Sequence, residues 1–318
     1  MPSGTASCYF GPSRTSSIRL CSSLYHFFAR PWALLNLPSP FAISGFSDRK
    51  VLSVTGGKHV LRLPNGMIMK RGIAVKEGEA KAMALVSAQG LPVPELLGFY
   101  NYTDYGYLFM KVVDGVTFHE AWPGLTPLQR SSLLSSISSA VSRLHTISRD
   151  FIGSPDGVAP TTFGVFETRT SSLSSPRELL EHLQREFVQR GQRLKGFDFS
   201  TPSPAFLSLF DDPSFIEQTS FSLQHCDLAP RNILVDPVSG ELKAIIDWED
   251  AAFLSVGFEY AALRLESWRP VPGAKELCEA LMALATEEEE RIGEILWDEI
   301  VTFTEAVWWV DEGPGRDV

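Results

Sequence analysis

The sequence predicts an α+β fold with two lobes, a small β-rich lobe at residues 50–113 and a larger, mainly helical lobe at residues 114–318, which together form one domain. Three observations carry this prediction. Short β-like runs separated by turn residues surround a single helical pattern in the first lobe. Helical patterns dominate the second lobe, and one polar motif between two apolar runs interrupts them.

Turn residues divide the first lobe into strands. Gly56-Gly57 forms one break and Pro64-Asn65-Gly66 forms the next. An Asn-Gly pair between two apolar runs is a strong hairpin signal. The predicted strands lie at Val51–Thr55, His59–Leu63, Met67–Lys70, Leu96–Tyr100 and Tyr105–Val113.

A helix is predicted between the third and the fourth of these strands, at Gly78–Gln89. Gly90 follows it, where a residue with positive φ commonly ends a helix. The face expected to be buried repeats at three-to-four spacing and consists of Ala80, Met83, Ala84 and Ser87.

The second lobe is predicted to begin with a capped helix. Thr126 precedes Pro127, and Gln129 follows three residues after the threonine, which is the capping-box arrangement. The apolar stripe expected on this helix is Leu134, Ile137, Val141 and Leu144. Further helices are predicted at Arg177–Gln192, Glu259–Trp268, Ala274–Ala285 and Glu287–Val307, the last capped by Thr286 and Glu289.

Composition restricts the partners. The net charge of −10 argues against a nucleic-acid partner, because such binding depends on lysine and arginine neutralising phosphates, and it is compatible with a cationic small molecule. No apolar run approaches the ~20 residues that span a bilayer, so no membrane span is predicted. The four cysteines lack the spacing of metal sites or disulfide frameworks, which favours a reducing compartment.

Residues 1–49 differ from the rest of the chain. No acidic residue occurs before Asp48, and Arg14, Arg19 and Arg30 lie among many serines. This bias is typical of a mitochondrial transit peptide, and a disordered leader is the other interpretation. We therefore expect the protein in the cytoplasm, with the mitochondrion as the alternative.

The segment from His225 to Glu249 carries the chemistry. It contains His225-x-Asp227-x-x-x-x-Asn232 and, after an apolar run, Asp247. Phosphoryl transfer needs a carboxylate beside the attacking hydroxyl and oxygen ligands that hold Mg²⁺ against a triphosphate. Asp227 is the predicted base, and Asn232 and Asp247 are the predicted metal ligands.

The spacing of this segment predicts a hairpin. Asn232 begins a β-like run, a turn follows at Pro237–Gly240, and the returning run Leu242–Ile246 ends on Asp247. Such a hairpin would bring Asn232 and Asp247 to the same end, as a shared metal ion requires.

These residues resemble the aminoglycoside phosphotransferase family, whose members share the protein-kinase fold. Its fungal-type members have a loop like HGDLxxxNILVD, a hairpin and then IIDWE, and this chain reads HCDLAPRNILVD and AIIDWE. The resemblance covers residues 50 to 265 approximately. It implies a protein-kinase-like fold and transfer of the γ-phosphoryl group of ATP, with Mg²⁺, to a hydroxyl of a small molecule.

The resemblance also implies a nucleotide site in the first lobe. A lysine contacts the phosphates and a helical glutamate holds that lysine. Lys70 and Glu79 occupy these positions, with EAKAMALV where the family has EAEALRFV. Lys76 is the rival lysine, but it lies only three residues from Glu79 and no strand of adequate length precedes it.

Backbone groups are expected to bind the adenine. The segment Tyr107–Gly115 resembles the family's YIVMEYIPG, which implies that Met110 lies near the base and that Lys111 and Val112 offer main-chain partners. Gly56 and Gly57 would provide a phosphate-covering loop.

The chain departs from the family pattern at two places. Cys226 replaces a usual glycine, which would strain the loop if positive φ is required there. After Glu249, only Gly257 and Glu259 match later family positions, and Glu259 has the alternative role of opening a helix. A catalytically degenerate nucleotide-binding protein is thus the alternative function. A protein kinase is disfavoured, because the sequence has no DFG or APE motif.

Overall fold

The structure is a computed structural model that describes residues 8–9, 50–55, 57–63, 66–102, 104–160, 171–191, 201–255, 257–267 and 270–311. The chain divides into two compact units. Unit 1 is Met1–Asp114 with Lys243–Glu249, and unit 2 is Gly115–Leu242 with Asp250–Val318. The predicted lobe boundary lies one residue earlier than this division. The segment Lys243–Glu249, which we assigned to the second lobe, belongs to unit 1.

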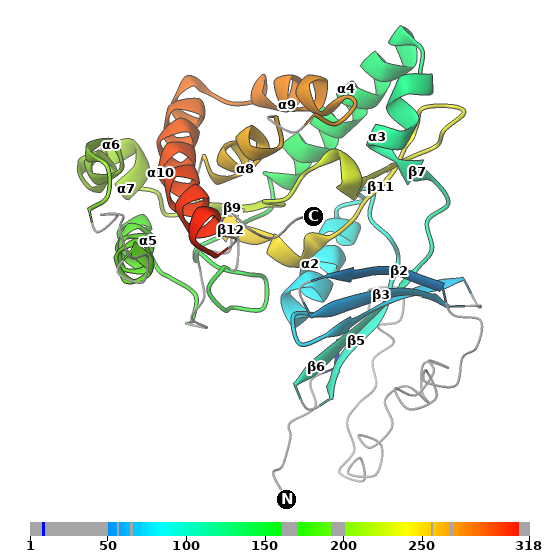
Figure 1. The fold of residues 1–318 in the computed structure, drawn as a ribbon, viewed down its shortest axis with the longest axis horizontal. Helices are drawn as coiled ribbons and strands as arrows, with labels where there is room; N and C mark the ends of the chain where they lie inside the picture. The colour runs from blue at the N-terminus through cyan, green and yellow to red at the C-terminus, as the bar shows by residue number, and fades with distance from the viewer. Residues whose placement is uncertain are drawn as a thin grey trace, which may run out of the picture. The chain divides into compact units, whose positions relative to one another are not determined.

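A six-stranded sheet forms most of unit 1 (Figure 1). Its strand order is β1-β5-β6-β4-β3-β2, and neighbouring strands are antiparallel. The strands are β1 (Cys8–Tyr9), β2 (Lys50–Thr55), β3 (Lys58–Leu63), β4 (Met67–Gly72), β5 (Leu96–Tyr102) and β6 (Tyr105–Lys111). This confirms the five predicted strands. Strand β1 comes from the predicted leader, whose other residues up to 49 lie outside the described part of the chain.

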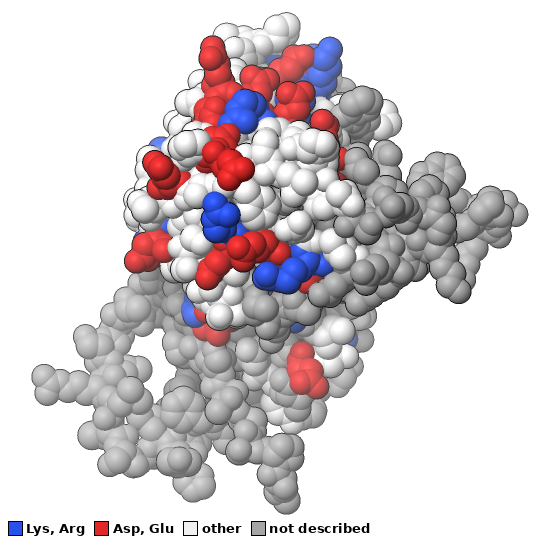
Figure 2. Space-filling model, turned by 90° about the vertical axis from the view of Figure 1, so that its left-hand side faces the viewer, with Lys and Arg blue, Asp and Glu red and all other residues white. Residues whose placement is uncertain are grey.

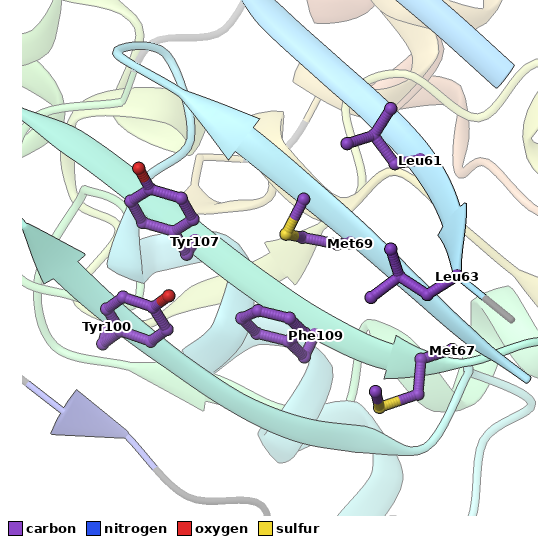
Figure 3. Close-up of a cluster of buried hydrophobic side chains, with 7 residues drawn as sticks. All are labelled: Leu61, Leu63, Met67, Met69, Tyr100, Tyr107 and Phe109. Carbon is purple, nitrogen blue, oxygen red and sulfur yellow. The ribbon is translucent and has the colours of Figure 1, made fainter. Parts of the chain in front are cut away.

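The register of this sheet separates two faces. Lys70 pairs with Leu108 and Met69 with Phe109, so Lys70 and Met69 point to opposite sides. The Met69 face carries a cluster of buried apolar side chains (Figure 3), which are Leu61, Leu63, Met67, Met69, Tyr100, Tyr107 and Phe109. The rings of Tyr100 and Tyr107 stack at 4.9 Å within it. The Lys70 side chain is thereby left to the opposite face of the sheet.

Helix α2 (Glu77–Ala88) is the helix that was predicted in the first lobe. Gly90 has φ of 65°, which confirms the expected left-handed residue after its end. The buried side of α2 includes Glu79, which is 1 % exposed, together with the predicted Ala80, Met83 and Ala84. Ser87 is only partly buried. A glutamate therefore lies in the interior of unit 1, on the side of the sheet that carries Lys70.

Helices dominate unit 2 (Figure 1). Short strands accompany them, with β10 pairing β7, and β9 lying between β8 and β12. The strands are β7 (Val116–Thr117), β8 (Ser148–Arg149), β9 (Phe221–Gln224), β10 (Ile233–Val235) and β12 (Ala252–Leu254). Strand β11 (Leu242–Ile245) follows the turn after β10, and all of it but Leu242 belongs to unit 1. The helices are α3 (Phe118–Ala121), α4 (Pro127–Leu144), α5 (Pro176–Gly191), α6 (Pro204–Ser208), α7 (Pro213–Ile216), α8 (Phe258–Ser267), α9 (Ala274–Met282) and α10 (Glu287–Asp311).

Helix α4 begins as predicted. The Thr126 hydroxyl accepts the Gln129 amide, and the Gln129 side chain accepts the Thr126 amide at 2.9 Å, which confirms the capping box. The apolar stripe differs from the prediction at one position, because Leu133 is 1 % exposed while Leu134 is only partly buried. The stripe starts one residue earlier, so that Ala140 also joins the core.

The C-terminal helices contact one another closely. The Gly257 turn before α8 approaches α10 so nearly that a Cβ there would lie 2.9 Å from the Gly293 nitrogen. Thr286 and Glu289 form the predicted capping box of α10. Among the described residues, no helix is long and apolar enough to cross a membrane. On the face drawn in Figure 2, acidic and basic side chains lie interspersed rather than gathered by sign.

The corrected stripe of α4 gives a stability prediction. Leu133→Ala is expected to lower the free energy of unfolding by about 2–5 kcal/mol, because it removes a buried side chain and leaves a cavity. Leu134→Ala, at the neighbouring position, should cost clearly less. Denaturant unfolding of the two variants measures this difference. A larger loss for Leu134→Ala would contradict the assigned face.

Candidate active site

The predicted catalytic loop follows the central strand of a small sheet in unit 2. Strand β9 pairs with β8 on one side and with β12 on the other, and it ends at Gln224 directly before His225. Phe221 and Leu223 of this strand are fully buried. The loop therefore begins from a position fixed by two neighbouring strands.

Asp227 is held by residues of its own loop. Its Oδ2 accepts a 2.8 Å hydrogen bond from the Asn232 side-chain amide, and its Oδ1 is paired with the Arg231 guanidinium. Asn232 Nδ2 also donates to the Asp227 carbonyl at 2.8 Å. Because the amide nitrogen of Asn232 faces Asp227, its carbonyl oxygen is the atom left for a cation. The loop thus orients a partly exposed carboxylate and a buried amide oxygen together.

His225 supports the backbone of the loop. The side chain is fully buried, and its Nδ1 accepts the Asp227 amide at 3.2 Å. The buried ring of His225 therefore orients the loop backbone at Asp227.

Glu259 anchors the same loop from α8. Its Oε2 accepts the backbone amides of His225 at 2.6 Å and Cys226 at 3.3 Å. Its own amide donates to Gln224 Oε1 at 2.7 Å, and the Gln224 side-chain nitrogen donates to the Ser255 carbonyl at 2.9 Å. Burial raises the pKa of Glu259 to about 7, although the two amides oppose the shift. Glu259 therefore does more than open helix α8, because its carboxylate also binds two backbone amides of the loop.

Cys226 occupies a left-handed backbone conformation. Its φ is 63° and its side chain is 5 % exposed. The condition under which the sequence predicts strain, positive φ at a non-glycine residue, is therefore met. The hydrogen bond that its backbone amide donates to Glu259 Oε2 holds the residue in this conformation.

A cluster of charged side chains lies within unit 1. Lys70 Nζ donates to Glu79 Oε1 at 2.6 Å and is also paired with Asp247. Lys70 is 7 % exposed and Glu79 is 1 % exposed. Burial raises the pKa of Glu79 against the opposing effect of Lys70. Burial alone would lower the pKa of Lys70, but the carboxylates of Glu79, Asp247 and Glu249 outweigh it and raise that pKa.

A second ion pair completes this cluster. Lys58 of β3 is paired with Glu249, and both side chains are about one-fifth exposed. Single carboxylate oxygens of Glu79, Asp247 and Glu249 all lie within 4.8 Å of one another. Carboxylate oxygens are the ligands that a hard cation such as Mg²⁺ prefers. The oxygens of Glu79, Asp247 and Glu249 suit a hard cation, and Asp247 is one of the two ligands that the sequence predicts.

Asp247 has an unusual backbone conformation. Its φ is 67°, and Cys226 is the other non-glycine residue with positive φ in the described ranges. The buried Trp248 follows it and donates its indole N–H to the Ile245 carbonyl at 2.9 Å. Strained backbone of this kind gathers at functional sites. The turn aims the Asp247 carboxylate at Lys70.

The predicted site residues fall into the two units. Unit 2 brings Asp227 and Asn232 together, and unit 1 brings Lys70, Glu79 and Asp247 together. A metal ion shared by Asn232 and Asp247 stays a prediction.

Two backbone amides of the segment predicted to bind adenine already donate hydrogen bonds within unit 1. The amide of Lys111 donates to the Glu95 carbonyl at 2.9 Å, and the amide of Val112 donates to the Gly66 carbonyl at 3.0 Å. Both N–H groups are thus engaged within unit 1 and cannot also serve a base. A contact from these two residues would have to use their carbonyl oxygens. Met110 lies on the Lys70 face of the sheet and is 6 % exposed.

The rival lysine lies outside the cluster. Lys76 is the N-cap of α2, and its ammonium donates to the nearby Ile73 carbonyl. Gly57 has φ of 75°, whereas Gly56 lies outside the described residues.

Sequence reasoning missed three residues of these clusters. Lys58 and Glu249 were not assigned, although Glu249 belongs to the quoted IIDWE segment and Lys58 directly follows the two glycines. Glu259 was left between two roles. Its available signal was the Gly257-x-Glu259 spacing after Asp247.

The anchor residue gives a pH prediction. The pKa of Glu259 is about 7 in the folded chain against an ordinary 4.5, so the folded state binds a proton more tightly. The resulting stability is full below pH 4.5 and is lost as the pH rises through 7, a change on the order of 3 kcal/mol. Glu259→Gln keeps an acceptor oxygen and does not titrate. Its unfolding free energy should fall less than that of the unmodified protein between pH 5 and pH 8.

Urea unfolding at several pH values measures this effect. Glu276→Gln, at an exposed glutamate of α9, is the matched control and should follow the unmodified protein. Parallel pH profiles for Glu259→Gln and the unmodified protein would refute the assignment.

Three solved structures share the fold. The chain aligns with a thermostable mutant of the aminoglycoside phosphotransferase APH(4)-Ia in ternary complex with AMP-PNP and hygromycin B, at 18 % identity, a TM-score of 0.56 and coverage of 87 % of this chain and 98 % of that one. It aligns with the GDP and kanamycin complex of APH(2″)-IIia at 14 % identity and a TM-score of 0.54, covering 90 % and 91 %. It also aligns with the streptomycin–ATP complex of APH(2″)-IIa at 13 % identity and a TM-score of 0.52, covering 94 % of this chain and 93 % of that one.

These likenesses confirm the predicted α+β, protein-kinase-like fold class. No curated protein matches the sequence. The model of the phosphotransferase enzyme family matches residues 39–292, which is most of the 318-residue chain. The chain, with its catalytic-type loop and its buried lysine–glutamate pair, therefore belongs to the phosphotransferase enzyme family.

Proposed function

We propose that this protein transfers the γ-phosphoryl group of ATP, with Mg²⁺, to a hydroxyl group of a small molecule. The observation that carries the proposal is the buried pair of Lys70 and Glu79, with Asp247 on the same lysine. Removing charges from water is costly, and a buried ion pair is a poor source of stability. A function that needs a fixed cation near a carboxylate explains why the pair is there.

Each residue has a role in the proposed reaction. Lys70, held by Glu79, contacts the phosphates of the nucleotide. Asp227 accepts the proton of the acceptor hydroxyl, and Arg231 and Asn232 keep its carboxylate oriented. Glu259 keeps the loop backbone in place.

Asn232 and Asp247 are the proposed ligands of Mg²⁺. Their amide and carboxylate oxygens suit a hard cation, and the Asn232 nitrogen is already engaged by Asp227. The ion, when bound, supplies positive charge against the negative charge of the triphosphate. With Asp247 bound to the ion, Lys70 would contact the phosphates of the nucleotide instead of Asp247.

The proposed acceptor is a hydroxyl-bearing and cationic small molecule. The net charge of −10 is compatible with such a substrate. Three proteins with this fold were solved with hygromycin B, kanamycin and streptomycin. We therefore propose aminoglycosides as the first acceptors to test with labelled ATP.

Asp227→Asn tests the reaction. The substitution keeps the size of the side chain and removes the base, so single-turnover consumption of Mg·ATP should slow by about 100- to 10,000-fold. Equal rates in the variant and the unmodified protein would sink the enzyme proposal. Binding of Mg·ATP without turnover in either protein would favour the catalytically degenerate alternative.

Lys70→Met tests the nucleotide site against its rival Lys76→Met. Loss of the phosphate contact should weaken Mg·ATP binding by about tenfold or more in Lys70→Met, and Lys76→Met should bind as the unmodified protein does. Isothermal titration gives both dissociation constants. The opposite order would assign the nucleotide lysine to position 76.

Removal of Lys70 leaves Glu79 buried without its cation, which costs about 3–5 kcal/mol of stability. The double variant Lys70→Met/Glu79→Gln removes both charges and keeps the test valid if the single variant fails to fold.

A further inference from the structure

The cluster in unit 1 contains two lysines rather than one. Lys58 and Lys70 both lie in unit 1, as do Glu79, Asp247 and Glu249. With two ammonium groups and three carboxylates in their ionised forms, the cluster carries a net charge of −1. The proposed function uses one lysine, so the position of the second requires its own account.

The sheet register places the two lysines on the same face. Val60 lies directly opposite Lys70, and Lys58 lies opposite Gly72. Since side chains two residues apart on a strand share a face, Lys58 points to the same side of the sheet as Val60 and Lys70. Lys58 and Lys70 are thus diagonal neighbours on two adjacent strands, a separation of roughly 7–8 Å between such positions. Two long lysine side chains that start from such positions can reach one common polyphosphate.

Each lysine is held by its own glutamate. Glu79 of α2 holds Lys70, and Glu249 holds Lys58. Lys58 is paired with Glu249 across 191 positions of sequence, so the pair depends on the fold and not on local spacing. The arrangement at Lys58 therefore repeats the arrangement at Lys70 beside it.

Some polar atoms of the cluster have no hydrogen-bond partner in the described part of the chain. Glu79 Oε2 and Glu249 Oε2 are buried oxygens without a hydrogen-bond partner in the described structure. Buried polar atoms of this kind are costly and call for an explanation. An ammonium has three donors, and the described residues engage one donor of Lys58, through Glu249. Among the contacts of the described residues, donors of Lys58 therefore remain for an anion.

We propose that Lys58 is a second phosphate-binding residue of the nucleotide site and that Glu249 is its positioning residue. The proposal rests on the proposed function, because it names a further contact to the same nucleotide. The phosphate oxygens of a polyphosphate would take the remaining ammonium donors of Lys58. Lys58 directly follows Gly57, whose φ is 75°.

Binding by the Lys58→Met variant tests the proposal. Its dissociation constant for Mg·ATP should rise by about 10- to 100-fold, because a charge-assisted contact is lost. Binding of adenosine, which has no phosphate, should stay within about twofold of the unmodified protein. Lys58→Arg should recover part of the affinity for Mg·ATP, and Glu249→Gln should weaken it less than Lys58→Met does.

Lys81→Met is the matched control. It removes another ion pair of unit 1, between Lys81 and Glu77 of α2, and should leave both dissociation constants unchanged. Thermal unfolding shows that each variant is folded at the temperature of the titration. Equal losses of adenosine and Mg·ATP affinity in Lys58→Met would reduce Lys58 to a structural clamp and overturn the proposal.

Failure of this inference is distinct from failure of the proposed function. Weak Mg·ATP binding by Lys70→Met together with unchanged binding by Lys58→Met would leave the function standing and remove only the second lysine. An unmodified protein that binds no Mg·ATP would remove both.

Discussion

The organisation of unit 1 depends on the burial of Lys70 beside Glu79. Two charged groups that are 7 % and 1 % exposed must satisfy one another, because neither keeps water for compensation. The requirement fixes α2 against the sheet at Glu79 and brings Asp247 to the same lysine. Strand β4 supplies the lysine on one face, while Met69 on the other face joins the apolar cluster of Figure 3. One alternation of side chains thus separates the charged site from the apolar packing.

Unit 2 solves the corresponding problem with a different partner. The carboxylate of its buried Glu259 accepts the backbone amides of His225 and Cys226. In both units a buried glutamate has its pKa raised by burial and positions a group proposed to act on substrate. The difference follows from what is positioned, since a cation needs an opposite charge and a loop backbone needs an acceptor.

The sequence predicted most of what local pattern determines. The capping box at Thr126 and the left-handed Gly90 follow from spacing within a few residues, whereas the pairing of Lys70 with Glu79 is what the family resemblance implied. Lys58 could not be predicted in this way, because its partner Glu249 lies 191 positions away. The loss of the Lys111 and Val112 amides as donors was equally hidden, since their partners Glu95 and Gly66 depend on the register of the sheet.

Backbone strain connects these anchors to function. Cys226 and Asp247 are the two non-glycine residues with positive φ among the described positions. Cys226 directly precedes Asp227, the proposed base, and Asp247 is itself a proposed metal ligand. A left-handed conformation costs roughly 1–2 kcal/mol for a residue with a Cβ, so the surrounding contacts must over-determine it. Glu259 does so at Cys226, and the Lys70 pair with the Trp248 indole bond does so at Asp247.

The contacts of Glu259 and Lys70 therefore fix the backbone geometry at Cys226 and Asp247. Release of Glu259 would let the Cys226 backbone relax and would move the amide of Asp227, which follows it directly. The fold bears two free-energy costs here, one for burying charged side chains and one for the left-handed backbone at Cys226 and Asp247. Stability alone explains neither cost, whereas the proposed phosphoryl transfer explains both, because it needs the carboxylates of Asp227 and Asp247 in fixed orientations.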